Sequence, residues 1–460
     1  MRYVSTRGGD CSLGFTDAVL EGLSRDGGLL VPQSFPDLSA QLGQLKAQTY
    51  QDLAARLFRP FIGEEFEEGK VEELIERSYS TFSHREIAPL SFHNGFSLLE
   101  LYHGPTFAFK DIALQFLGNL FEEILKKKKR DFNILGATSG DTGSAAIQGV
   151  KGKVGIRIFM LYPKGRISEI QERQMTSVLE ENVVNIAIRG TFDDGQRIVK
   201  EIFGDLEFKD RFRLGAVNSI NWVRVMAQIV YYFYSAFRFW ERYGEKTPLH
   251  FSVPTGNFGD IYAGTLARKM GLPIKKLILA TNENDILYRV LTTGIYEIGE
   301  VTPSLSPAMD IQVASNFERF LFDLLDGNGT VVKSKISDLQ QTGRFELNDS
   351  QLQKAREVFL PMRVNSEETL SCMRRHASAG LVLDPHTAVG VVAGERSGLE
   401  RVICLSTAHP AKFGETVERA CRTKVVLPAA IAALAHKKTR SVTVRPDRSE
   451  IKRIIREHAS

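Results

Sequence analysis

The sequence is best read outward from His103-Gly104-Pro105-Thr106-Phe107-Ala108-Phe109-Lys110-Asp111. An apolar segment typical of a strand, residues 96–102, precedes it. Apolar residues at spacings of three and four follow it and predict a long helix. Lys110 therefore stands between aromatic neighbours where a strand gives way to a helix, so partial desolvation should lower its pKa, as an amine nucleophile requires. Taken alone, the position also suits a surface lysine whose side chain reaches water.

Two glycine-bearing loops elsewhere join a predicted strand to a predicted helix. Thr138-Ser139-Gly140-Asp141-Thr142-Gly143 and Thr255-Gly256-Asn257-Phe258-Gly259-Asp260 each follow an apolar run. The first N–H groups of a helix have no intrahelical partner and lie at the positive end of its dipole, so each loop could bind an anion. Asp260 could instead cap its helix or compete with the anion. The second loop alone would be an ordinary turn, but together with Lys110 and the first loop it favours a ligand site.

Together these segments resemble the β-family (fold type II) of pyridoxal-phosphate enzymes and, within it, the threonine synthases. The resemblance runs from about residue 1 to about residue 430, and residues 5–9, 218–222 and 407–413 also carry it. It implies an α/β fold of two lobes with mainly parallel sheets, plus a mostly helical N-terminal region. The expected boundaries are 1–94 for that region, 95–130 and 210–435 for the large cofactor-binding lobe, 131–209 for the small lobe and 436–460 for a C-terminal strand–helix tail.

Alternating apolar and helical patterns agree with parallel α/β layers. The most apolar helix candidate, residues 225–237, is too short to span a bilayer and is predicted to be a buried core helix. In the tail, Asp447 and Glu450 predict a capping box. The expected strands are residues 96–102, 132–136, 155–162, 183–188, 249–253, 276–280, 402–405 and 441–444, and the expected helices include 168–180, 193–203, 219–243 and 260–270.

The resemblance also implies pyridoxal 5'-phosphate as the cofactor and a set of site residues. Lys110 would be the catalytic lysine that carries the cofactor. Thr407 would meet the pyridine nitrogen with a neutral hydroxyl, which cannot stabilise a pyridinium as an aspartate would. The remaining cofactor-binding residues would be Gly256, Asn257, Phe258, Gly259, Asp260 and Asp141, and the substrate-binding residues would be Ser139, Gly140, Thr142, Lys164, Asn218, Ser219 and Arg224.

The expected activity is the conversion of O-phospho-L-homoserine and water to L-threonine and phosphate. Which basic residue holds the substrate phosphate stays open among Lys164, Arg166 and Arg224, and so does the role of Asp141. Two alternatives also stay open. One is another β-family lyase, such as a serine/threonine dehydratase or a phospho-amino-acid phospholyase. The other is a non-catalytic relative that keeps the fold, although the intact Lys110 speaks against it.

Composition sets broad limits on location and partners. The 460 residues carry a net charge of +4 with 25% charged residues, which is no nucleic-acid signature, and the N-terminus has no apolar signal core. The four cysteines are too scattered for a disulfide framework or structural zinc, and no metal-binding motif is present. We therefore expect a cytoplasmic enzyme with a small-molecule substrate, no metal, no nucleic acid and no membrane contact. A monomer is compatible with the sequence, and the oligomeric state stays open.

Overall fold

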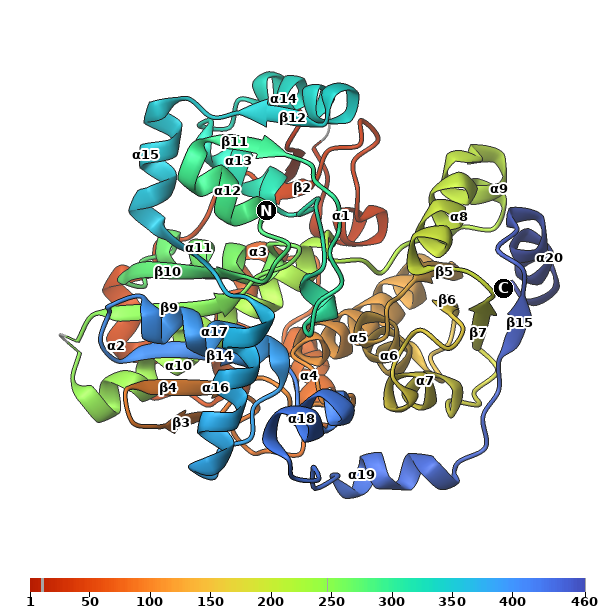
Figure 1. The fold of residues 1–460 in the computed structure, drawn as a ribbon. Coiled ribbons are helices and arrows are strands. Elements are labelled where there is room, and N and C mark those ends of the chain that lie inside the picture. The colour runs from red at the N-terminus through yellow and green to blue at the C-terminus, as the bar shows by residue number, and fades with distance from the viewer. Residues whose placement is uncertain (10–11, 246, 460) are drawn as a thin grey trace.

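Two parallel sheets divide the protein into two halves (Figure 1). The computed structural model describes residues 1–9, 12–245 and 247–459. In the larger half, β3 pairs antiparallel with β4 and the other neighbouring strands are parallel. In the smaller half, all neighbouring strands are parallel. The larger sheet has the order β13 (Phe359–Arg363), β10 (Ile274–Thr281), β9 (Leu249–Pro254), β14 (Val402–Ser406), β4 (Phe96–Glu100), β3 (Leu90–Phe92), and the smaller has β15 (Val442–Val444), β7 (Val183–Ile188), β6 (Ile156–Pro163), β5 (Phe132–Ala137), β8 (Leu214–Gly215).

The predicted α/β class and the parallel sheets are confirmed. Each expected strand corresponds to an observed one within a few residues, because continuous apolar runs are what a sheet covered on both faces requires. The lobe boundaries remain predictions. Helices connect the parallel strands, and those of the expected ranges are α7 (Glu169–Thr176), α8 (Phe192–Gly204), α10 (Trp222–Tyr243) and α11 (Gly259–Lys269).

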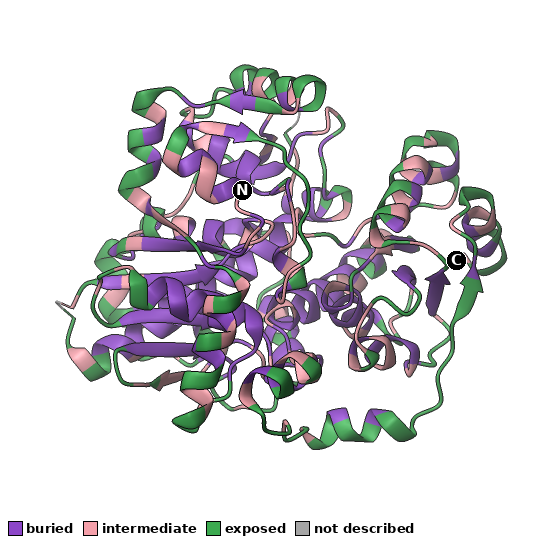
Figure 2. Ribbon diagram, in the orientation of Figure 1, coloured by how far each residue is buried: buried purple, intermediate pink, exposed green. Residues whose placement is uncertain are grey.

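The core is continuous across the junction between the two halves. Helix α5 (Lys110–Lys128) packs against α10 in the larger half and against α6 (Asp141–Val150) in the smaller half. Helix α10 is buried along most of its length, which confirms the core helix predicted at 225–237. Figure 2 shows buried residues along the larger sheet and on the helices where the halves meet. No helix within the described ranges is both long and apolar enough to cross a membrane.

The N-terminal region is mostly helical, as expected, and packs on α5 and α10. It also contains a short antiparallel pair that its sequence pattern does not predict, β1 (Tyr3–Ser5) with β2 (Leu30–Pro32). Strands of three residues are too short to show an alternation. The helices of this region are α1 (Phe15–Glu21), α2 (Leu42–Leu45), α3 (Tyr50–Ile62) and α4 (Lys70–Tyr79).

Residues 282–358, between β10 and β13, form a layer of short elements that covers one end of the larger half (Figure 1). Its strands β11 (Ile295–Glu297) and β12 (Arg344–Glu346) pair with each other in a separate antiparallel ribbon. Its helices are α12 (Ile286–Thr293), α13 (Phe317–Leu324), α14 (Gly329–Thr342) and α15 (Asp349–Val358). After β13, α17 (Pro385–Arg396) packs on the larger sheet, and α16 (Ser366–Ser378) packs on α17.

The C-terminal chain leaves the larger half and ends on the smaller one (Figure 1). After α18 (Gly414–Cys421) and α19 (Ala429–Ala432), β15 adds to the edge of the smaller sheet beside β7, and α20 (Arg448–His458) buries its apolar stripe there. Asp447 caps α20 by accepting from the N–H groups of Ser449 and Glu450. The predicted capping box is wrong in one part, because the Glu450 carboxylate accepts instead from the N–H of Arg445.

Candidate active site

Lys110 is the first residue of α5, and its amine is enclosed between the two halves. Its Nζ lies 3.4 Å from Oδ2 of Asp141 and 5.0 Å from the ring centre of Phe109. Burial lowers the pKa of Lys110, Asp141 opposes that effect, and the nearby cations Lys412 and Arg224 add to it. The desolvation expected at this strand–helix junction is therefore present in the fold.

The loop before Lys110 is held by its neighbour Asp111. The buried Asp111 carboxylate accepts from the N–H of Thr106 at 2.7 Å and from its hydroxyl at 2.8 Å. Burial raises the pKa of Asp111 to about 6, although these hydrogen bonds oppose it. A side chain at Gly104 would meet the Asp111 Cβ at 2.4 Å, so the loop can close on Asp111 only because residue 104 is glycine. Asp111 thereby fixes the direction in which Lys110 leaves the helix.

The loop that opens α6 is shaped by Thr138, whose hydroxyl accepts from the N–H groups of Gly140 and Gly143. Gly140 has φ of +128°, and a Cβ there would lie 2.4 Å from the Gln171 side chain. The turn therefore requires glycine at 140. It aims the next side chain, Asp141, inward at Lys110.

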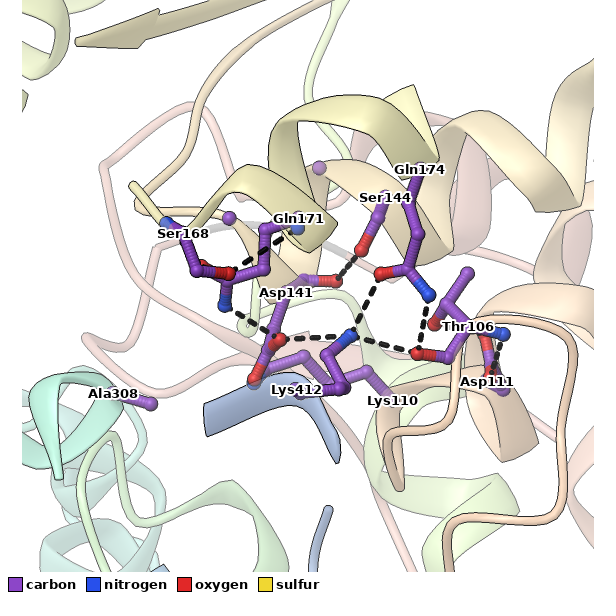
Figure 3. Close-up of polar contacts among 12 residues, drawn as sticks. Thr106, Lys110, Asp111, Asp141, Ser144, Ser168, Gln171, Gln174, Ala308 and Lys412 are labelled. Atoms are coloured by element: carbon purple, nitrogen blue, oxygen red, sulfur yellow. Dashed lines mark hydrogen bonds and ion pairs between the residues drawn. The ribbon is translucent and has the colours of Figure 1, made fainter. Parts of the chain in front are cut away.

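Asp141 is the electrostatic centre of the site (Figure 3). Its Oδ1 lies 3.0 Å from Nζ of Lys412 and accepts from Nε2 of Gln171 at 2.9 Å, while its Oδ2 faces Lys110. Burial alone would raise the pKa of Asp141, but Lys412 and Lys110 hold it well below its ordinary value. Asp141 is therefore a carboxylate shared by two lysines.

Lys412, Gln171 and Gln174 are residues that sequence reasoning missed. Lys412 lies within the 407–413 segment that carries the resemblance, immediately after β14, but nothing in that segment marks it as buried. Its side chain is fully buried, and Gln174 accepts from it at 3.0 Å. The signal that could have found Lys412 is its place in a segment that carries the resemblance.

The loop that opens α11 presents its backbone to the same pocket. Phe258 takes up φ of +65°, and a Cβ at Gly256 would meet the Ala308 carbonyl oxygen at 2.8 Å. Asp260 does not cap the helix. Its carboxylate accepts from the hydroxyls of Tyr231 at 2.5 Å and Tyr232 at 3.0 Å, and burial raises its pKa to about 6. The competition expected between Asp260 and a bound anion is reduced, because the carboxylate turns toward these phenols.

Arg224, on α10, is the cation of this pocket whose position most suggests a ligand. Only 5% of it is exposed, and its Nε and Nη1 have no hydrogen-bond partner among the described residues. Burial lowers its pKa to about 10, so it stays charged at neutral pH. A buried guanidinium with free donors is costly unless an anion meets it.

One pocket brings together most of the predicted residues. Those lining it are Lys110, Asp141, Thr142, Ser219, Arg224, Gly256, Asn257, Phe258, Gly259, Asp260 and Thr407. His386 also lines it and is held by Asp384 and by the N–H of Ala308. Ser139 and Asn218 are exposed, Gly140 is buried, and none of the three lines this pocket in the described part of the chain.

Lys164 is not brought to that pocket. It is exposed, lies 3.4 Å from the Thr443 hydroxyl, and lines a separate open hollow with Arg166, Arg189 and Gly190. Among the candidates for a phosphate ligand, Arg224 is therefore the one that shares a pocket with Lys110.

Away from the pocket, the fold brings Cys372, His376 and Glu395 together, with one potential ligand atom of each within 4.8 Å of the others. Glu395 is already paired with Arg375 at 2.5 Å and with His376 at 3.1 Å. A divalent ion would have to displace the guanidinium, so this group is accounted for as an ion-pair cluster. Cys404 is a buried free thiol and Cys421 a partly buried one, and Cys11 lies outside the described residues.

Comparison with known proteins agrees with this geometry. A family model described as "Pyridoxal-phosphate dependent enzyme" matches residues 89–342, which include Lys110 and both glycine loops. The fold and the site thus define a pyridoxal-phosphate-dependent enzyme. Models described as "Threonine synthase N terminus" and "Threonine synthase, C-terminal" match residues 2–79 and 387–455. The chain belongs to the threonine synthase family.

Relatives of known identity support the same family. The threonine synthase of Pseudomonas aeruginosa is 44% identical, with 100% of this chain and 99% of the relative covered. A crystal structure of threonine synthase from Brucella melitensis with bound pyridoxal phosphate is 42% identical and superposes with a TM-score of 0.96, covering 100% of this chain and 99% of that one. The yeast threonine synthase structure is 43% identical with a TM-score of 0.95, covering 99% and 98%.

Proposed function

We propose that this chain converts O-phospho-L-homoserine and water to L-threonine and phosphate, with Lys110 as the lysine that carries the cofactor. In this reaction the bond between Cγ and the phosphate oxygen breaks and phosphate leaves. A Cβ–H bond breaks and the water oxygen bonds to Cβ. Of the proton from Cβ and the proton lost by water, one is delivered to Cγ and one to the departing phosphate. The observation that carries the proposal is the pocket itself, which combines a mostly enclosed lysine, a glycine-lined helix start and the guanidinium of Arg224, whose Nε and Nη1 have no partner among the described residues.

The pocket has features that fit pyridoxal phosphate. The start of α11 offers backbone N–H groups without intrahelical partners, and Gly256 has no room for a side chain beside Ala308. We assign the cofactor phosphate to the backbone of Gly256, Asn257, Phe258 and Gly259. Thr407, buried at the carboxyl end of β14, would face the ring nitrogen with a neutral hydroxyl.

When bound, the cofactor supplies an electron sink that acidifies protons at Cα and Cβ of an amino acid. Lys110 would take the proton from Cα and then one from Cβ, because its buried amine is the basic group at the centre of the pocket. Asp141 lies 3.4 Å from that amine and, as a carboxylate, would accept a hydrogen bond from the ammonium between transfers. The enclosure of the site between the halves would exclude water until the Cβ step requires it.

Two anionic groups of the substrate need partners. We assign its carboxylate to the α6 loop, Ser139 to Thr142, whose shape is fixed by Thr138. We assign its phosphate first to Arg224, because that side chain is buried, charged and without a protein partner among the described residues. Ser219 lines the pocket, Asn218 neighbours it, and either could add donors.

Product identity tests this proposal. Purified enzyme given O-phospho-L-homoserine should release threonine and phosphate in equal amounts. Release of ammonia and a 2-oxo acid would instead make the chain a dehydratase or a phospholyase. Borohydride should fix the visible chromophore, and peptide mapping should place the adduct on Lys110; an adduct on Lys412 would overturn the assignment. The cytoplasmic location stays a prediction, which cell fractionation tests.

A further inference from the structure

Two lysines share the buried carboxylate of Asp141, but they are held very differently (Figure 3). The ammonium of Lys412 has three acceptors: the Thr106 carbonyl at 2.7 Å, Gln174 Oε1 at 3.0 Å and Asp141 Oδ1 at 3.0 Å. Since an ammonium has three N–H donors, all of them can be used. Among the residues that the structure describes, Lys110 has one such contact, with Asp141 at 3.4 Å. Three acceptors therefore hold the Lys412 ammonium in place, whereas the Lys110 amine can move away from Asp141 at the loss of one long contact.

Lys412 also joins the two halves of the molecule. It lies in a short 3-10 helix (Pro410–Phe413) that follows β14 of the larger half. Gln174 and Asp141 belong to α7 and α6, which connect strands of the smaller half. Replacing Lys412 would thus change both a charge and an inter-half contact, and an experiment must separate the two.

The charge balance of the pocket requires a second cation. If Lys110 were the only counter-ion of Asp141, each proton that Lys110 gave up would leave a buried carboxylate unpaired. A buried charge left without its partner is strongly unfavourable. Lys412 removes that cost, because it stays beside Asp141 whatever the state of the Lys110 nitrogen.

We propose that Lys412 is a positioning residue that serves as the permanent counter-charge of Asp141 and so allows Lys110 to release its proton. This inference rests on the proposed assignment of Lys110 as the cofactor lysine. Lys412 itself takes no proton from the substrate. Its role is to hold Asp141 in place and to weaken the hold of Asp141 on Lys110.

The charged groups around the two lysines support this arrangement. Lys110 faces Asp141, Lys412 and Arg224. Burial lowers its pKa first, Asp141 raises it, and Lys412 lowers it again. Asp141 faces the two lysines and His386, and Lys412 contributes more than Lys110 to its lowered pKa. Loss of Lys412 should therefore leave the Lys110 nitrogen with a stronger hold on its proton.

The test is the pH dependence of the visible band of the holoenzyme, recorded without substrate. Lys412→Met removes the charge and keeps an unbranched side chain. The pH midpoint of the band should rise by roughly one to two units, the size expected when a nearby charge is removed. Lys153→Met is the matched control, because Lys153 is a partly buried lysine that pairs with Glu122 outside the pocket. Its midpoint should equal that of the wild type.

An unchanged or lowered midpoint in Lys412→Met would overturn the inference, and so would a wild-type band that does not change between about pH 6 and 10. If Lys412→Met does not fold, Lys412→Met with Asp141→Asn removes the pair together. Its midpoint should then fall below that of the wild type, since the nearer charge is negative, and an unchanged value would overturn the inference. Failure to find the borohydride adduct on Lys110 in the wild type would instead refute the proposed function.

Discussion

The loops that open α6 and α11 lead into their helices through the same two residue types, but the two aspartates face opposite kinds of partner. Each carries a glycine followed by an aspartate at the start of its helix, Gly140-Asp141 in one and Gly259-Asp260 in the other. Both carboxylates are buried and both line one pocket. Asp141 points to Lys412 and Lys110, whereas Asp260 points to the phenols of α10.

The difference shows that neighbours, rather than the local motif, decide the charge of each loop. Burial pushes the pKa of both aspartates upward, but two lysines reverse that effect for Asp141, and two hydroxyls do not reverse it for Asp260. The α6 loop is thus an anionic element balanced by cations. The α11 loop keeps its helix start available for a phosphate, because its own carboxylate is turned aside.

The substitution Gly256→Val tests most directly whether the α11 loop binds the cofactor phosphate. A Cβ there would lie 2.8 Å from the Ala308 carbonyl oxygen, so the loop must shift away from the position we assign to the phosphate. We expect cofactor affinity to fall by about ten- to hundredfold, measured by titration of the visible band. Gly43→Val is the control, because a Cβ at Gly43 meets nothing within 4 Å. If Gly256→Val bound the cofactor with wild-type affinity, the cofactor phosphate would have to be assigned to another part of the pocket.

An effect of similar size on catalysis should separate Arg224 from Lys164 as the ligand of the substrate phosphate. Arg224→Met removes a buried guanidinium from the pocket and should reduce kcat/KM by about ten- to hundredfold, as expected for one charge-assisted hydrogen bond. Lys164→Met alters an exposed side chain beside Thr443 and should have less effect. Part of the Arg224 loss should appear in kcat, because charge develops on the departing phosphate. A larger loss of kcat/KM in Lys164→Met than in Arg224→Met would assign the substrate phosphate to the hollow that Lys164 lines.

The sequence predicts the local parts of this site and not the distant ones. Lys110 and both glycine loops are found because each is a strand–loop–helix junction that shows in a few consecutive residues. Lys412 and Gln174 are missed because they meet only when the two halves pack together. The orientation of Asp260 is missed for the same reason, since Tyr231 lies 29 residues away in the chain. Composition and periodicity do not predict contacts between residues that are distant in the chain.

The last expected effect concerns stability and tests the environment of Asp260 directly. The pKa of Asp260 rises from 3.8 to about 6 in the fold, so the unfolded chain loses this proton first as the pH increases. Asp260 therefore lowers the stability of the fold as pH rises through this window, by about 3 kcal/mol at most. Asp260→Asn should gain stability over the wild type between pH 4 and pH 7, whereas Tyr231→Phe, which removes a donor to the carboxylate, should lose it over the same range. Thermal unfolding of the three proteins at both pH values measures this, and differences that do not change with pH would show that Asp260 is already ionised in the fold at pH 4, like Asp141.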